Sequence, residues 1–292
     1  MLRLWNKVSG NGPLVMLAAT LVFPWMGLGV AAAAPLPPAE ITFFRFALSL
    51  PLMGLLHRGG VLHVQFNNRR LLFLRGTYAG VAVLCYFAAI SKIGAGRATL
   101  FNNCYPFFAF LSAVYVGQEE FHTKSALLLL VALSGLLLIV APGVGAVEWG
   151  WGPALGLLSA SFAGAGFVVI RDLRKTDEAP AIYTAMCVVG MLLALPFALP
   201  VFTWPTLHQW GWLGIITVCS TAAQLLMNHA LRYLSATAGS ILSALTTAFT
   251  ALFAFLFFGE HYQTSFFVGA GLIFGAAAFI AKESHKDPAF GG

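Results

Sequence analysis

The chain has 292 residues, of which 59% are hydrophobic and only 9% are charged, and its mean hydropathy is +0.85. Soluble domains carry about 25% charged residues, so a chain of this length with so few charges cannot cover a folded core with polar surface. The composition excludes a soluble globular protein and indicates an integral membrane protein.

The apolar segments follow one another with short connections. A spanning helix needs about 20 mostly apolar residues, and about ten windows of that length occur between Gly, Pro or charge clusters. The expected helices are 12–34, 39–57, 70–91, 95–117, 124–142, 151–171, 180–201, 209–232, 236–258 and 264–282. The segment 1–11 is short and basic, and the apolar run after it reaches spanning length, so we expect a first membrane helix and no cleaved signal peptide.

The positive charges predict how the helices are oriented. With a cytoplasmic N-terminus, most Lys and Arg residues fall at cytoplasmic helix ends, namely Arg3, Lys7, Arg58, Arg69, Arg70, Arg75, Lys124, Arg171, Arg174, Lys175, Arg232, Lys282 and Lys286. Lys92 and Arg97 fall outside, and Arg45 lies within a helix. Because cytoplasmic loops retain positive charge, we expect both termini in the cytoplasm. The net charge of +6 therefore requires no nucleic-acid partner.

Cysteines, histidines and nucleotide motifs give no sign of catalysis. Four cysteines lie inside apolar segments without the spacing of a metal site or a disulfide framework, so we expect them to pack as small hydrophobic residues. They are Cys85, Cys104, Cys187 and Cys219. The seven histidines are scattered, and a Walker A sequence is absent. We therefore expect no enzyme, no metal and no cofactor. A channel is also disfavoured, because nothing resembles a selectivity filter.

An internal duplication divides the chain. Gly-Pro opens the expected helices at 12 and at 152, and the stretch Ala89–Glu119 aligns without a gap on Ala230–Glu260 at an offset of 141 residues. Each stretch contains a short loop, a helix rich in small residues and a terminal glutamate. Five helices per copy is an odd number, so the second copy is inverted, an arrangement typical of secondary transporters. We expect one repeat at 1–145 and the other at 146–292.

The duplicated pattern resembles the EamA-type branch of the drug/metabolite transporter superfamily. The similarity rests on GPLVMLAATLVFPWMGLG in the first helix, PPAEITFFRF at the second, GQE ending at Glu119, APG at 141–143 and FFGE ending at Glu260. It implies a multi-pass protein of the bacterial inner membrane, monomeric or homodimeric, whose first, third, fourth, sixth, eighth and ninth helices surround a central cavity. The sequence GQEE leaves open whether Glu119 or Glu120 is equivalent to Glu260.

Polar and aromatic residues inside the expected helices are the candidate substrate contacts. Polar groups in a membrane are costly unless they pair or line water, and here they concentrate in the helices that the resemblance places around the cavity. The candidates are Trp25, Tyr78, Tyr86, Asn102, Asn103, Tyr105, Gln224, Asn228, Ser243 and Thr247. Pro24 and Pro106 are expected to kink their helices. Each Ser or Thr can instead bond its own helix, and the asparagines can instead join helices.

Two ionisable residues have alternative roles. Arg45 either binds a substrate carboxylate, or snorkels or pairs with Glu40. His229 either relays a proton or packs as a hydrogen-bonded histidine.

The sequence thus predicts a secondary transporter that moves an amino acid or related amphipathic solute by alternating access, with export favoured. Uptake of a vitamin-like aromatic solute is the alternative.

Overall fold

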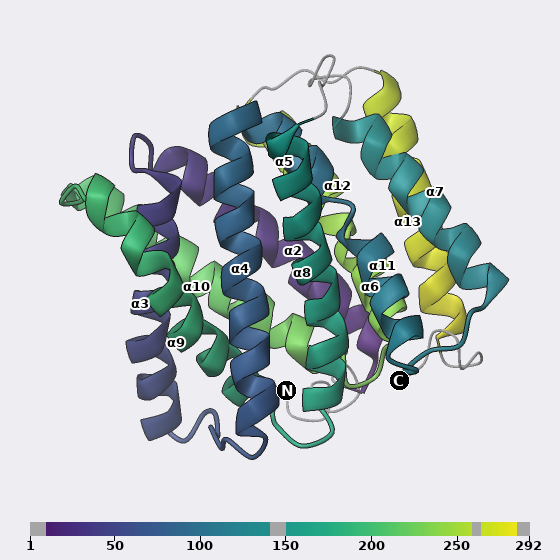
Figure 1. Cartoon of the computed structure of the whole chain (residues 1–292), viewed down its shortest axis with the longest axis horizontal. Helices are drawn as coiled ribbons and strands as arrows, with labels where there is room; N and C mark the ends of the chain where they lie inside the picture. The colour runs from purple at the N-terminus through teal and green to yellow at the C-terminus, as the bar shows by residue number, and fades with distance from the viewer. Residues whose placement is uncertain (1–9, 141–149, 259–263, 285–292) are drawn as a thin grey trace.

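The computed structural model describes residues 10–140, 150–258 and 264–284, and these ranges form an all-helical bundle (Figure 1). The helices are α2 Gly12–Ala32, α3 Pro38–Arg58, α4 Arg69–Ile93, α5 Ala95–Asn102, α6 Tyr105–Tyr115, α7 Thr123–Val140, α8 Trp151–Leu173, α9 Ala179–Ala198, the short 3-10 helix η2 Leu199–Val201, α10 Leu207–Ala230, α11 Ala236–Ser243, α12 Leu245–Phe258 and α13 Thr264–Glu283. In the described ranges, nine helical segments are long and apolar enough to cross a membrane. The predicted all-helical membrane fold is confirmed.

Local sequence explains where several helices begin. The side chains of Asn11, Asn68 and Ser235 each accept a hydrogen bond from a backbone N–H in the first turn of α2, α4 and α11. Thr206 and Gln209 form a reciprocal capping box at the start of α10. These caps satisfy N–H groups that a helix leaves without a partner, so the helix starts follow closely from the sequence.

Two predicted helices are interrupted. The segment 95–117 forms α5 and α6 with a break at 103–104, and the segment 236–258 forms α11 and α12 with a break at Ala244. The expectation of continuous helices was wrong at both places. The breaks are related by the same offset of 141 residues as the sequence repeat, and α5 and α11 have matching bounds at that offset.

Pro106 begins a helix and does not kink one. It lies in the first turn of α6, where the missing N–H of proline would have no helical acceptor. The chain therefore turns at Asn103 and Cys104 and restarts at Tyr105. In the second half Ala244 makes the equivalent turn without a proline.

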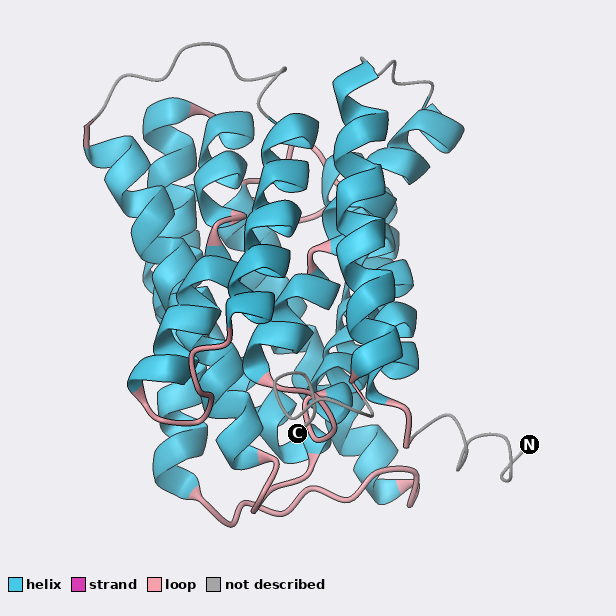
Figure 2. Ribbon diagram, turned by 90° about the vertical axis from the view of Figure 1, so that its right-hand side faces the viewer, coloured by secondary structure: helices cyan, strands magenta, loops and turns pink. Residues whose placement is uncertain are grey.

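The helix pairs follow the pseudo-symmetry of an inverted repeat. Helix α2 packs along α10 as α4 packs along α8, while α3 pairs with α9 and α7 pairs with α13. Figure 1 shows the α7–α13 pair at one flank and the α3–α9 pair at the other, and Figure 2 shows the long helices lying side by side. Every one of these pairs joins the first half to the second, so the core lies between the halves.

Glu119 connects three helix ends on one face of the bundle. Its Oε1 accepts a hydrogen bond of 3.1 Å from the backbone N–H of Thr237 in the first turn of α11, and it lies 3.7 Å from Nη1 of Arg171. Glu120 is exposed. Glu119 is thus the buried, partnered member of the pair. Glu260 lies outside the described residues.

Helices α7 and α13 cross at two glycines. A Cβ on Gly269 would lie 2.5 Å from the carbonyl oxygen of Gly135, and a Cβ on Gly135 would lie 2.6 Å from the carbonyl oxygen of Gly269. Both obstacles are backbone atoms, which cannot turn away as a side chain does. Close approach of small residues is a common way to pack helices in membranes, and this crossing depends on it.

We predict that Gly269→Ala lowers the stability of the protein by about 1–3 kcal/mol, because the added methyl group pushes α7 and α13 apart. Gly271→Ala on the same helix is the control, since a Cβ there has open space within 4 Å. Thermal unfolding of both purified variants in detergent measures the difference. Equal melting temperatures for the two variants would contradict the crossing.

Candidate functional site

A cavity of about 340 Å³ lies at the centre of the bundle, between the two halves. Both interrupted helices border it, together with α2, α3, α4, α8, α9 and α10. The lining residues are Phe23, Met26, Arg45, Phe46, Arg75, Ala79, Ala82, Val83, Asn102, Asn103, Tyr105, Ala163, Phe167, Met186, Gln224, Met227, Ser243, Thr246 and Thr247. The volume suits a small organic molecule. Helices α3 and α9, which the resemblance did not place around the cavity, also contribute.

Equivalent positions of the two repeats face the cavity at the helix breaks. At the offset of 141 residues, Asn102 corresponds to Ser243 and Tyr105 corresponds to Thr246, and all four line the cavity. The first half supplies an amide and a phenol where the second supplies two hydroxyls. The two repeats therefore contribute the same backbone arrangement to the cavity wall but different hydrogen-bonding side chains.

Two amides of the cavity wall each have a buried polar atom that no described protein group satisfies. Nδ2 of Asn103 and Oε1 of Gln224 are buried, and neither has a hydrogen-bond partner among the described residues. Asn102 differs, because its Oδ1 lies 2.8 Å from the hydroxyl of Ser159, which also lies 2.7 Å from the carbonyl oxygen of Ala82. Because buried polar groups normally have partners, this donor and this acceptor are unusual features of the cavity wall.

A hydrogen bond across the cavity wall joins the two interrupted helices. The hydroxyl groups of Tyr105 and Ser243 are 2.6 Å apart. The Tyr105 ring stacks on Phe167 of α8 with a centroid distance of 5.7 Å and an interplanar angle of 10°. Tyr105 is thereby held in place from two sides, and its ring forms a flat wall of the cavity.

Arg45 faces the cavity and is not paired with Glu40. Its Nη1 donates to the thioether sulfur of Met26 at 3.4 Å, and its guanidinium carbon lies 4.5 Å from the centroid of the Phe46 ring. Glu40 instead accepts hydrogen bonds from the backbone N–H and the hydroxyl of Thr203. Of the roles weighed for Arg45, the pair with Glu40 is therefore wrong.

Arg75 is a charged lining residue that the sequence did not single out as a candidate. It was counted among the cytoplasmic charges, but it lies more than one turn inside α4, is 7% exposed, and lines the cavity. Its Nη2 donates to the sulfur of Met186 at 3.3 Å. The available signal was its position inside an expected helix with no acidic residue within four positions on either side.

The other candidates lie away from the central cavity. Tyr78 packs edge-on against Phe162, and the Tyr86 hydroxyl lies 2.6 Å from that of Thr99. Trp25 is 42% exposed. Two more, Pro24 in α2 and Asn228 in α10, are buried without facing the cavity.

The hydroxyl residues of α11 and α12 separate into two groups. Ser240 and Thr250 donate to carbonyl oxygens three or four residues earlier in their own chain segment. Ser243 and Thr247 line the cavity. Thr246 lines it as well, so the hydroxyl residues that line the cavity lie on both sides of the break at Ala244.

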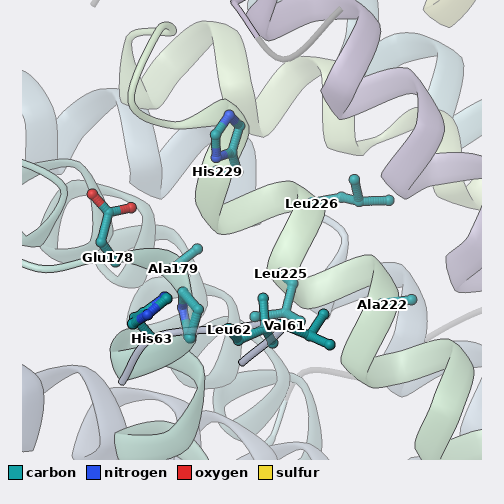
Figure 3. Close-up of a pocket in the computed structure, with 10 residues that line it drawn as sticks. Val61, Leu62, His63, Glu178, Ala179, Ala222, Leu225, Leu226 and His229 are labelled. Atoms are coloured by element: carbon teal, nitrogen blue, oxygen red, sulfur yellow. The ribbon is translucent and has the colours of Figure 1, made fainter. Parts of the chain in front are cut away.

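A second cavity of about 580 Å³ lies on another face of α10 (Figure 3). It is lined by Val61, Leu62, His63, Glu178, Ala179, Pro180, Ala222, Leu225, Leu226 and His229. His229 therefore faces this cavity, whereas Gln224 and Met227 of the same helix face the central one. The second cavity is mostly apolar, and the carboxylate of Glu178 is engaged by Arg174 at 3.0 Å and by Arg232 at 3.6 Å. The central cavity is accordingly the candidate site.

Comparisons with known proteins find a family and relatives that match most of the chain. The family model described as EamA-like transporter family matches residues 12–141 and 150–282. The pseudopaline exporter CntI of Pseudomonas aeruginosa is 32% identical over 275 residues, which cover 93% of this chain and 96% of the exporter. A riboflavin transporter of Brucella anthropi is 23% identical over 261 residues, covering 85% and 89% of the two chains.

A solved crystal structure has the same fold. It superposes with a TM-score of 0.77 at 14% sequence identity, and the match covers 91% of this chain and 96% of the other. At this identity the likeness concerns the fold alone. It supports the arrangement of the helices.

We predict that Tyr105 and Ser243 are energetically coupled. Tyr105→Phe and Ser243→Ala should each cost about 0.5–1.5 kcal/mol of stability, and the double variant should cost less than their sum, because one hydrogen bond is lost in all three. A double-mutant cycle of unfolding in mixed detergent micelles measures the coupling. Tyr78→Phe is the control, and additive costs for Tyr105→Phe and Ser243→Ala would contradict the bond.

Proposed function

The chain belongs to the EamA-like transporter family, whose members are transporters and not enzymes, and from this premise we propose that it exports an amino acid or a related amphipathic metabolite. The observation that carries the proposal is the central cavity, which lies between the halves and takes polar groups from both helix breaks. Binding at the interface of inverted repeats, next to discontinuous helices, is the arrangement on which alternating access depends. Rocking of one half against the other would expose the cavity to each side in turn.

The central cavity has both apolar and polar lining residues, which supports the proposal of an amphipathic solute. Aromatic rings from both halves face the cavity at Phe23, Tyr105 and Phe167, while the free amide atoms of Asn103 and Gln224 offer one donor and one acceptor. A site of this kind orients a small molecule by a few polar contacts and encloses the rest in apolar surface. An amino acid derivative with an apolar or aromatic part fits both kinds of wall.

The direction of transport is supported by the relatives. The more similar of the two described relatives is an exporter, at 32% identity, and the riboflavin transporter is 23% identical. Uptake of a vitamin-like aromatic solute is the second candidate, and the stacked Tyr105 and Phe167 rings favour it. Export remains our proposal because the exporter is the more similar and is matched over nearly its whole length.

The proposal includes the orientation of the chain in the membrane and its division into two repeats. We place both termini in the cytoplasm, because the distribution of Lys and Arg follows the positive-inside rule. The first repeat is assigned to 1–145 and the second to 146–292, a division supported by the two matched stretches 12–141 and 150–282. A monomer or a homodimer in the bacterial inner membrane stays a prediction.

Transport in proteoliposomes tests the function. We expect saturable flux of at least one solute from a panel of labelled amino acids, their derivatives and riboflavin. Gln224→Leu should lower that flux about tenfold or more, since it removes a buried acceptor from the cavity and leaves a polar solute without a partner.

Val218→Leu is the matched control. It lies on the same helix, and its side chain is 57% exposed, so it should keep the flux of the unaltered protein. Equal flux in the Gln224 and Val218 variants would remove the central cavity from the transport path. Absence of saturable flux for every solute in the panel would overturn the proposed function.

A further inference from the structure

Two guanidinium groups face the central cavity without an anionic partner. Arg45 and Arg75 each donate to a thioether sulfur, and the Nε of each is buried without an acceptor among the described residues. A thioether is a weak acceptor, while arginine has five N–H donors and keeps its proton at any physiological pH. Most of the hydrogen-bonding capacity of both groups is therefore unused in the empty protein.

No carboxylate of the cavity wall balances these charges. The residues that line the cavity in the described part of the chain include no Asp or Glu. The buried carboxylate of Glu40 is bonded to Thr203, and Asp177 accepts hydrogen bonds from the backbone N–H groups of Asn67 and Asn68. Two positive charges thus lie at the central cavity, and no acidic residue within 10–140, 150–258 and 264–284 neutralises them.

Two buried positive charges without anionic partners are energetically unfavourable unless a ligand neutralises them. Ionised residues within membrane helices are rare and mark substrate or ion pathways. The surroundings hold both groups at the cavity surface. The Phe46 ring lies against Arg45, and a Cβ on Gly166 would lie 3.4 Å from Nη1 of Arg75. Glycine at 166 therefore leaves room beside the Arg75 guanidinium.

We propose that the central cavity selects solutes with two carboxylate groups, one bound by Arg45 and the other by Arg75. The planar guanidinium matches the two oxygens of a carboxylate. The amide nitrogen of Asn103 and the amide oxygen of Gln224 then bind the uncharged polar groups between the carboxylates. This inference rests on the proposed function, since it names the solute class of the same cavity.

The selection has a physical basis in charge neutralisation. A dianion brings a charge equal and opposite to that of the two arginines, so the loaded cavity is neutral, whereas a monoanion leaves one guanidinium without a partner. A neutral solute leaves the positive charges of both guanidinium groups without a counter-charge. A dicarboxylic metabolite is therefore favoured over a neutral aromatic one in this cavity.

Binding to the purified full-length protein tests the inference. The probes are aliphatic dicarboxylates from succinate to pimelate, each compared with its monoamide and its diamide, which have nearly the same shape but carry one or no charge. For at least one chain length, we expect the dicarboxylate to bind about tenfold or more tightly than the monoamide. The diamide should bind more weakly still.

Variants separate recognition from a structural role. Arg45→Gln and Arg75→Gln should each reduce the preference for dicarboxylate over monoamide to about twofold or less, and should leave the melting temperature of the empty protein unchanged or raised, because each removes an unneutralised buried charge. Arg70→Gln, an exposed position on α4, should keep the full preference. A structural role would instead lower the melting temperature of the empty variants.

Several results would overturn the inference. These are equal binding of dicarboxylate and monoamide at every chain length, no binding of any dicarboxylate, and survival of the full preference in both arginine variants. The transport panel of amino acids and riboflavin distinguishes the two proposals. If a solute of that panel is transported while dicarboxylates do not bind, the charge selection fails and the transporter function stands.

Discussion

The structure depends on one constraint, which is that backbone polar groups must find partners inside the protein when a chain crosses hydrocarbon. Helices satisfy this requirement within themselves, so irregular backbone at membrane depth is tolerated only where it is buried in protein or lines a polar cavity. The chain departs from regular helix at 103–104 and at Ala244, and both breaks border the central cavity. The cavity therefore lies where the two helices are interrupted, because the residues at the breaks form part of its wall.

The duplication explains why the breaks occur in pairs, and divergence explains why the cavity is asymmetric. Equivalent backbone positions carry Asn102 and Ser243, and Tyr105 and Thr246. The two walls therefore offer a solute different hydrogen-bonding groups at equivalent positions. Retaining the backbone plan preserves the packing of α2 on α10 and of α4 on α8, while the side chains are free to specialise for one solute.

Unneutralised charge links stability to function in this cavity. Arg45 and Arg75 contact Met26 and Met186, whose sulfur atoms are weak acceptors, so the described residues give neither guanidinium an anionic partner. A solute that supplies the missing anion gains binding energy from the relief of this state. The same reasoning accounts for the open amide atoms of Asn103 and Gln224, since each would be better satisfied by a bound molecule than by the protein around it.

The sequence by itself determined the class, the repeat and nearly all helix bounds, because apolar length and the start signals at Asn11, Asn68 and Thr206 act locally. It also identified Asn102, Asn103, Tyr105, Gln224, Ser243 and Thr247, which do line the cavity. Only the tertiary structure decided that Tyr78, Tyr86 and His229 face elsewhere and that Arg75 faces inward. Which face of a helix turns toward the cavity depends on the helices packed around it. For Arg75 and Tyr78 the contacts, Met186 and Phe162, come from the other half of the chain. The convergence of Arg45 and Arg75 is therefore a property of the assembled bundle.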